Sequence, residues 1–320
     1  MKEALFVKRN AQKWKDFEQK QPQNTDELAE KYIELTDDLA YSKTFYPNSS
    51  TTKYLNGITS GFHQSIYKNK KESKSRIVTF WKTELPLLFY QYRKQLLYSF
   101  LFFIVAVVIG AASAKFDDNF VRLVMGDGYI NMTNENIAKG DPFAVYKQAG
   151  EMEMFVQIAL NNIRVAFYTF IAGIIFSFGT VIVLFRNGIM LGSFQYFFFS
   201  KGLGWASVLT IWLHGTLEIS SIVIAGAAGL ILGNSILFPG TLPRKTSILM
   251  GSKNSIKIAI GLVPLFLIAA FIEGFITRHT AMPIYLSLSV LIISALFIIW
   301  YTIIQPKKIY FKANNGTTKN

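Results

Sequence analysis

Five long apolar runs between residues 95 and 304 limit what this chain can fold into more than any other feature. They cover 95–114, 163–185, 206–237, 257–276 and 284–304. An α-helix needs roughly 20 apolar residues to cross a bilayer, and each run reaches or approaches that length. Hydrocarbon offers no partner for backbone polar groups, so such runs are stable as helices. The sequence predicts an all-α, polytopic membrane helix bundle.

The chain divides into parts of unlike composition. Residues 1–94 are polar and charged, and Leu28, Tyr32, Leu35 and Leu39 recur there at helical spacing. We therefore expect a cytoplasmic helical module over 1–94, a transmembrane helical domain over 95–304 with an extracytoplasmic segment at about 115–162, and a short basic cytoplasmic tail over 305–320.

The distribution of charge predicts the orientation in the membrane. The net charge is +13, and basic residues concentrate in 67–76, in the 238–257 loop and in the tail, whereas 115–162 carries seven acids against four bases. Basic loops stay on the cytoplasmic side, which explains the charge without nucleic acid as a partner. Both termini should then face the cytoplasm, in the inner membrane of a bacterium.

Two cytoplasmic termini need an even number of crossings, so a sixth segment is required. One candidate is 188–200, preceded by a tight turn at Arg186–Asn187 and crossing as a tilted or broken helix buried among others. In the alternative, 188–204 is re-entrant and the 206–237 run breaks at His214–Gly215. The alternatives differ in whether His214 lies inside a helix or at a break.

Ionisable residues lie inside the apolar runs, where each costs on the order of 2.5 kcal/mol or more unless it is paired. His214 and Glu218 are four residues apart, on one face of a helix. With Glu273, Asn187 and Arg164 they form a candidate intramembrane polar cluster. Such a cluster can fix helix register or serve as an ion or proton site. We predict no metal there, because a metal site needs further ligands that the sequence does not plainly supply.

Small residues mark faces where helices can approach closely. Gly188 and Gly192 form one GxxxG pattern, and Gly229 and Gly233 form another. We expect these glycines to pack helices together within the chain, with a self-association face and a homo-oligomer as the alternative.

Motifs of known enzyme classes do not occur. A metalloprotease helix needs a second histidine four residues after the first, and here that residue is Glu218. The chain has no cysteine, which excludes thiolate chemistry, and no glycine-rich nucleotide loop. We expect neither enzyme activity nor a cofactor.

A set of motifs between about 161 and 276 resembles the stage II sporulation protein M family of multi-spanning bacterial membrane proteins. They are Asn161-Asn162 with Ala166, Gly173, Gly179-Thr180, Asn187-Gly188 with Gly192, His214-Gly215-Thr216-Leu217-Glu218, Gly226 with Gly229, Pro239-Gly240 with Arg244, and Ile272-Glu273-Gly274-Phe275-Ile276. The resemblance implies an all-helical scaffold that localises two peptidoglycan-cleaving partners, stage II sporulation proteins D and P, in spore formers.

Two functions follow as hypotheses. The first is an integral membrane scaffold that sits in the lipid bilayer and organises cell-wall hydrolases or other envelope proteins. The second is an ion- or proton-coupled secondary transporter or channel, in which Glu218 or Glu273 carries a proton.

Overall fold

The computed structural model describes residues 2–19, 25–68, 75–147, 150–277 and 282–316, and it divides into two compact units. Unit 1 is Met1–Arg76 and unit 2 is Ile77–Asn320. All elements of the described part are helices, and alone or joined end to end they form six helical spans that are long and apolar enough to cross a membrane. The predicted all-α polytopic class is confirmed.

Unit 1 consists of three helices, α1 (Glu3–Gln19), α2 (Thr25–Phe45) and α3 (Ser50–Lys68). Its core is a cluster of apolar side chains: Phe6, Trp14, Leu35, Leu39 and Leu55. The indole nitrogen of Trp14 donates a hydrogen bond to Asp38 Oδ2 at 2.8 Å, so the polar edge of the buried ring is satisfied. Unit 1 therefore has a hydrophobic core of its own.

The boundary between the units lies earlier than the predicted one after residue 94. The helices α4 (Ser75–Thr79), η1 (Phe80–Glu84) and α5 (Leu85–Gln91) lead into unit 2. Leu85 and Phe89 are buried against Ile258 and Phe266, and Trp81 Nε1 donates to the Gly261 carbonyl at 3.3 Å. This segment belongs with the membrane bundle because its apolar face is buried there.

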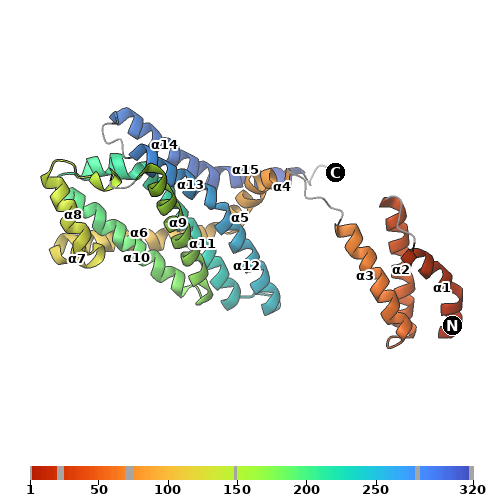
Figure 1. The fold of residues 1–320 in the computed structure, drawn as a ribbon. Helices are drawn as coiled ribbons and strands as arrows, with labels where there is room; N and C mark the ends of the chain where they lie inside the picture. The colour runs from red at the N-terminus through yellow and green to blue at the C-terminus, as the bar shows by residue number, and fades with distance from the viewer. Residues whose placement is uncertain (1, 20–24, 69–74, 148–149, 278–281, 317–320) are drawn as a thin grey trace. The chain divides into compact units, whose positions relative to one another are not determined.

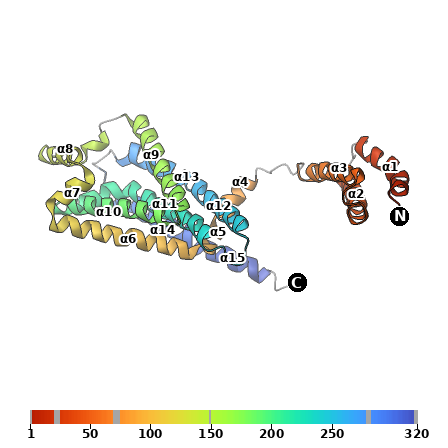
Figure 2. The same ribbon diagram turned by 90° about the horizontal axis from the view of Figure 1, so that it is seen from below.

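Unit 2 continues with α6 (Arg93–Phe116), α7 (Asp118–Met125), α8 (Asp127–Ala138), η2 (Ala144–Lys147), α9 (Glu151–Ile171), η3 (Ala172–Ile174), α10 (Phe178–Ser200), α11 (Gly204–Leu237), α12 (Arg244–Gly261), α13 (Val263–Phe271), η4 (Ile272–Thr277), α14 (Ile284–Ile299), η5 (Trp300–Ile304) and α15 (Gln305–Gly316). Within this unit, α7 and α8 lie at one end of the bundle and α5 and α15 at the other (Figures 1 and 2).

The predicted span 163–185 is wrong, because the chain turns in its middle. The second and third candidate spans are Glu151–Ile174 and Phe178–Ser200. Between them Phe176 and Ser177 adopt positive φ angles of 48° and 67°. Arg186 and Asn187, predicted to form a turn, lie instead inside α10, and the first part of α9 takes residues that were assigned to the 115–162 segment.

Other predicted boundaries shift because helices continue through polar residues. α11 is continuous through His214 and Gly215, so both the break at that point and a re-entrant 188–204 segment are wrong. The basic 238–257 loop is short, because α12 begins at Arg244. The tail continues as α15, in which Tyr310 stacks on Tyr90 with ring centroids 4.1 Å apart.

α11 is the central helix of unit 2 and contacts α6, α9, α10, α12, α13 and α14. Outward-facing side chains of the peripheral helices are large and apolar, including Phe100 and Val108 on α6 and Ile293 and Leu296 on α14. Exposed apolar surface of this kind suits contact with lipid. The core lies along α11, and the bilayer supplies the outer apolar surroundings.

The GxxxG glycines all pack helices within the chain. A Cβ added at Gly192 would lie 2.1 Å from the Val107 carbonyl oxygen on α6, and one at Gly188 would lie 2.6 Å from Ala106 Cβ. A Cβ at Gly229 would meet Thr180 Oγ1 at 2.2 Å, and one at Gly233 would meet Ser177 N at 2.2 Å. Glycine is needed here because these helices approach backbone to backbone.

Gly192→Ala should destabilise unit 2 by about 1–3 kcal/mol, because the added methyl group meets the α6 backbone, which cannot move aside as a flexible side chain can. Gly128→Ala in α8 is the matched control, since a Cβ there has nothing within 4 Å. Thermal unfolding of the detergent-solubilised protein measures both. Equal unfolding midpoints for the two variants would contradict this packing.

Candidate functional site

His214 lies inside α11 and is 3% exposed. Its Nδ1 atom is 3.1 Å from Thr277 Oγ1, and the Thr277 hydroxyl donates its hydrogen to the Ile272 carbonyl at 3.2 Å. We assign a hydrogen to His214 Nδ1, because a hydroxyl has one hydrogen and Thr277 can donate it to the Ile272 carbonyl. The Nε2 atom of His214 faces the other way.

Glu273 is the group that Nε2 of His214 faces. The distance from Nε2 to Glu273 Oε2 is 3.7 Å, and the two side chains are 4% and 14% exposed. Glu273 and Thr277 both belong to η4, one turn of π-helix at the end of α13. A π-turn is a rare local distortion that often occurs at functional sites.

Glu218 completes the group one turn further along α11. The side-chain amide of Asn162, on α9, donates a hydrogen bond to Glu218 Oε1. The imidazole of His214 and the carboxylates of Glu218 and Glu273 each offer one ligand atom, and these atoms lie within 4.8 Å of one another. We call His214, Glu218 and Glu273 the His-Glu-Glu site; it joins α11 to η4, with Asn162 linking α9.

Tyr146 of η2 covers this site from outside the candidate spans. Its ring meets the His214 ring edge to face, with centroids 5.8 Å apart. Burial raises the pKa of the Tyr146 phenol well above its usual value of 10.0, so it stays neutral at physiological pH. Tyr146 packs with Phe143, Val121 and Phe198, which places a small apolar layer over the end of the bundle.

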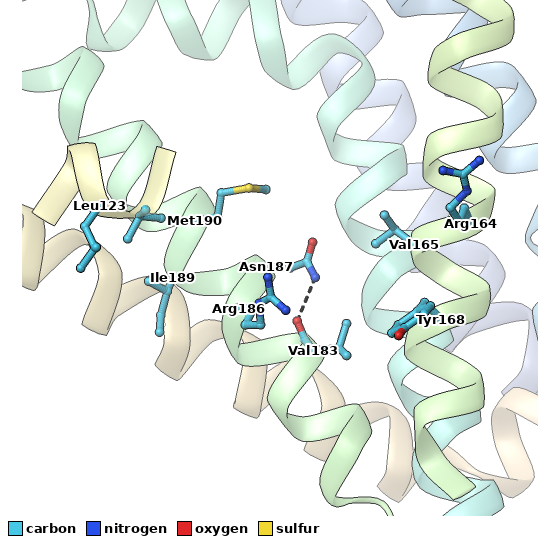
Figure 3. Close-up of a pocket in the computed structure, with 10 residues that line it drawn as sticks. Leu123, Arg164, Val165, Tyr168, Val183, Arg186, Asn187, Ile189 and Met190 are labelled. Carbon is cyan, nitrogen blue, oxygen red and sulfur yellow. Dashed lines mark hydrogen bonds between the residues drawn. The ribbon is translucent and has the colours of Figure 1, made fainter. Parts of the chain in front are cut away.

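The structure does not bring Arg164 and Asn187 to the His-Glu-Glu site. They line a separate hollow of about 510 Å³ between α9 and α10, together with Tyr168 and Arg186 (Figure 3). There the Asn187 amide donates to the Val183 carbonyl of its own helix at 2.8 Å. The predicted cluster thus divides into two places.

Sequence reasoning missed three partners of the site. Asn162 is a polar residue directly before an apolar run. This position suggests that its side chain needs a partner, but the sequence does not indicate that the partner is Glu218. Thr277 follows Glu273 by four residues, the spacing of one helix face. No sequence pattern indicated Tyr146, because only the folding of the chain brings its ring next to His214. Arg278 and His279, polar neighbours in the sequence, lie outside the described residues.

The arrangement has three chemical uses. It can hold the register of α9, α11 and η4 through polar contacts, hold and release a proton at a carboxylate, or bind a cation between the three ligand atoms.

Comparison with known families gave two matches. Residues 4–68, within unit 1, match a family described as a domain of unknown function. Residues 99–278 match the family described as Stage II sporulation protein M. The comparisons with curated proteins and with solved structures each found no match. The second match runs from within α6 to just past η4 and includes His214, Glu218 and Glu273 as well as Tyr146. Because it covers more than half of the 320 residues, this multi-pass membrane protein belongs to the stage II sporulation protein M family.

Proposed function

We propose that the protein is a membrane scaffold that organises partners of the cell envelope, such as cell-wall hydrolases. The observation that carries this proposal is the presence of two folded parts besides the membrane helices: unit 1, with its own core, and the layer formed by α7, α8 and η2. A scaffold needs surfaces that keep their shape while partners bind. Family membership supports the proposal, since the resemblance implies that role.

The α7–α8 layer offers a polar surface on top of its apolar core. Asp118 and Glu135 are exposed there, while Val121 and Ile130 are buried beneath them. Charged groups around an interface set partner choice and association rate more than affinity. This surface is therefore suited to bind a basic face of an envelope protein.

We further propose that the α7–α8 layer lies on the extracytoplasmic side of the membrane and that both termini lie on the cytoplasmic side. The even number of candidate spans, the basic residues Arg244 and Lys245 at the start of α12, and the basic tail support this orientation. Glu135→Cys should then react with a membrane-impermeant maleimide in intact cells, and Thr241→Cys only after permeabilisation. The protein has no cysteine of its own, which keeps the labelling specific. The opposite labelling pattern would overturn this orientation.

Charge reversal tests the scaffold. An Asp118→Lys, Glu135→Lys double variant should lose most of an envelope partner that co-purifies with wild type from gently solubilised native membranes, because like charges now meet at the interface. Quantitative mass spectrometry of the purified complexes measures the loss. Asp37→Lys, an exposed reversal in unit 1, is the matched control for this surface. Equal partner recovery from wild type, the double variant, Asp37→Lys and a variant lacking residues 1–76 would contradict the scaffold.

A second candidate function is cation-coupled transport, favoured by the two partly buried carboxyl groups among membrane helices. Glu218→Gln should then abolish flux of a coupled solute or ion in liposomes, because the amide cannot take up and release a proton. Glu153→Gln, at the exposed start of α9, should transport as wild type does. Folded wild-type protein that moves no ion under proton or sodium gradients would exclude this candidate.

A further inference from the structure

The His-Glu-Glu site holds two carboxyl groups without a permanently charged basic partner among the described residues. Glu218 and Glu273 are two acidic groups in the interior of the bundle, and His214 is the group that faces Glu273. Among the ion pairs of the described part, neither carboxylate meets a lysine or an arginine. Burying two unbalanced carboxylates is strongly unfavourable, so a proton or a cation must accompany them.

The hydrogen bonds of His214 favour a cation. Since its Nδ1 atom donates to Thr277, the Nε2 atom of the neutral ring presents a lone pair to Glu273 Oε2. Their separation of 3.7 Å is longer than a hydrogen bond. It is close to the distance of about 3.4 Å between two ligands of a tetrahedral ion with bonds of about 2.1 Å.

We propose that His214, Glu218 and Glu273 bind one divalent cation of the zinc type. A doubly charged ion neutralises the two carboxylates, and the neutral imidazole adds no charge. The wider ligand spacings, up to 4.8 Å, close by small rotations of the glutamate side chains. One imidazole with two carboxylates and an open fourth position is a donor set that zinc accepts, whereas Ca²⁺ and Mg²⁺ prefer oxygen ligands alone.

Supporting contacts around the ligands fit the same assignment. In protein metal sites, a ligating histidine almost always donates its second ring N–H to a neighbouring oxygen, and ligating carboxylates accept further hydrogen bonds. Here Thr277 takes the Nδ1 hydrogen of His214, and Asn162 donates to Glu218. The ion would tie α11 to η4 and, through Asn162, to α9, whether or not the protein acts as a scaffold.

Metal analysis of the full-length protein tests the proposal. Wild type purified in detergent, incubated with Zn²⁺ and passed through metal-free buffer should retain about one zinc ion per chain by inductively coupled plasma mass spectrometry. Mg²⁺ and Ca²⁺ should not be retained. Monodisperse, folded wild type without zinc would overturn the proposal, because protons would then neutralise the carboxylates.

Variants link the ion to these residues. Glu218→Gln and Glu273→Gln keep the shape of the side chain and should lose the zinc, whereas Glu153→Gln and His63→Ala, which lie elsewhere, should keep it. Asn162→Ala and Thr277→Val leave all three ligands in place and should weaken zinc affinity about 10- to 100-fold, as loss of a supporting contact does. Unchanged zinc content in both glutamate variants would place the ion elsewhere and overturn the proposal.

Discussion

Polar side chains inside the bundle must find their partners within the protein, because hydrocarbon offers none. The rest of unit 2 depends on how α11 meets this constraint. Gly226 and Gly229 of α11 let α6 and α10 approach this helix closely. Ser99 Oγ on α6 donates a hydrogen bond to the Val223 carbonyl of α11 at 2.6 Å. Ser247 Oγ on α12 donates another to the Ser235 carbonyl of α11 at 2.8 Å. The central helix thus combines close backbone contact with hydrogen bonds to its neighbours.

At the His-Glu-Glu site the same constraint applies to ionisable side chains. Each of its hydrogen bonds orients a side chain, yet the two carboxylates and the Nε2 atom of His214 still face one another. Such a cluster sits beneath the apolar layer of α7, α8 and η2, whose Tyr146 ring covers His214. The membrane interior and the layer that we propose for docking are therefore in direct contact.

Sequence patterns predicted the class of the fold and grouped His214 and Glu218 with Glu273, but they did not predict the helix boundaries. Six spans follow from hydropathy and charge, and the spacing of His214 and Glu218 places them on one face. The turn at Phe176–Ser177 escaped prediction because it interrupts a uniformly apolar run and uses no glycine or proline at its positive φ angles. Arg164 and Asn187 were assigned to the site from their polarity alone, and only the packing of α9 against α10 shows that they line a different hollow.

The cation that we propose at the His-Glu-Glu site would link the central helix to two of its neighbours. Zinc K-edge X-ray absorption of the folded, zinc-loaded protein tests for this cation directly, since the spectrum reports the atoms bound to the ion. We expect one imidazole nitrogen and carboxylate oxygens at about 2.0–2.2 Å, with the imidazole signal lost in His214→Ala. A shell of oxygen atoms alone, unchanged by that substitution, would contradict this expectation.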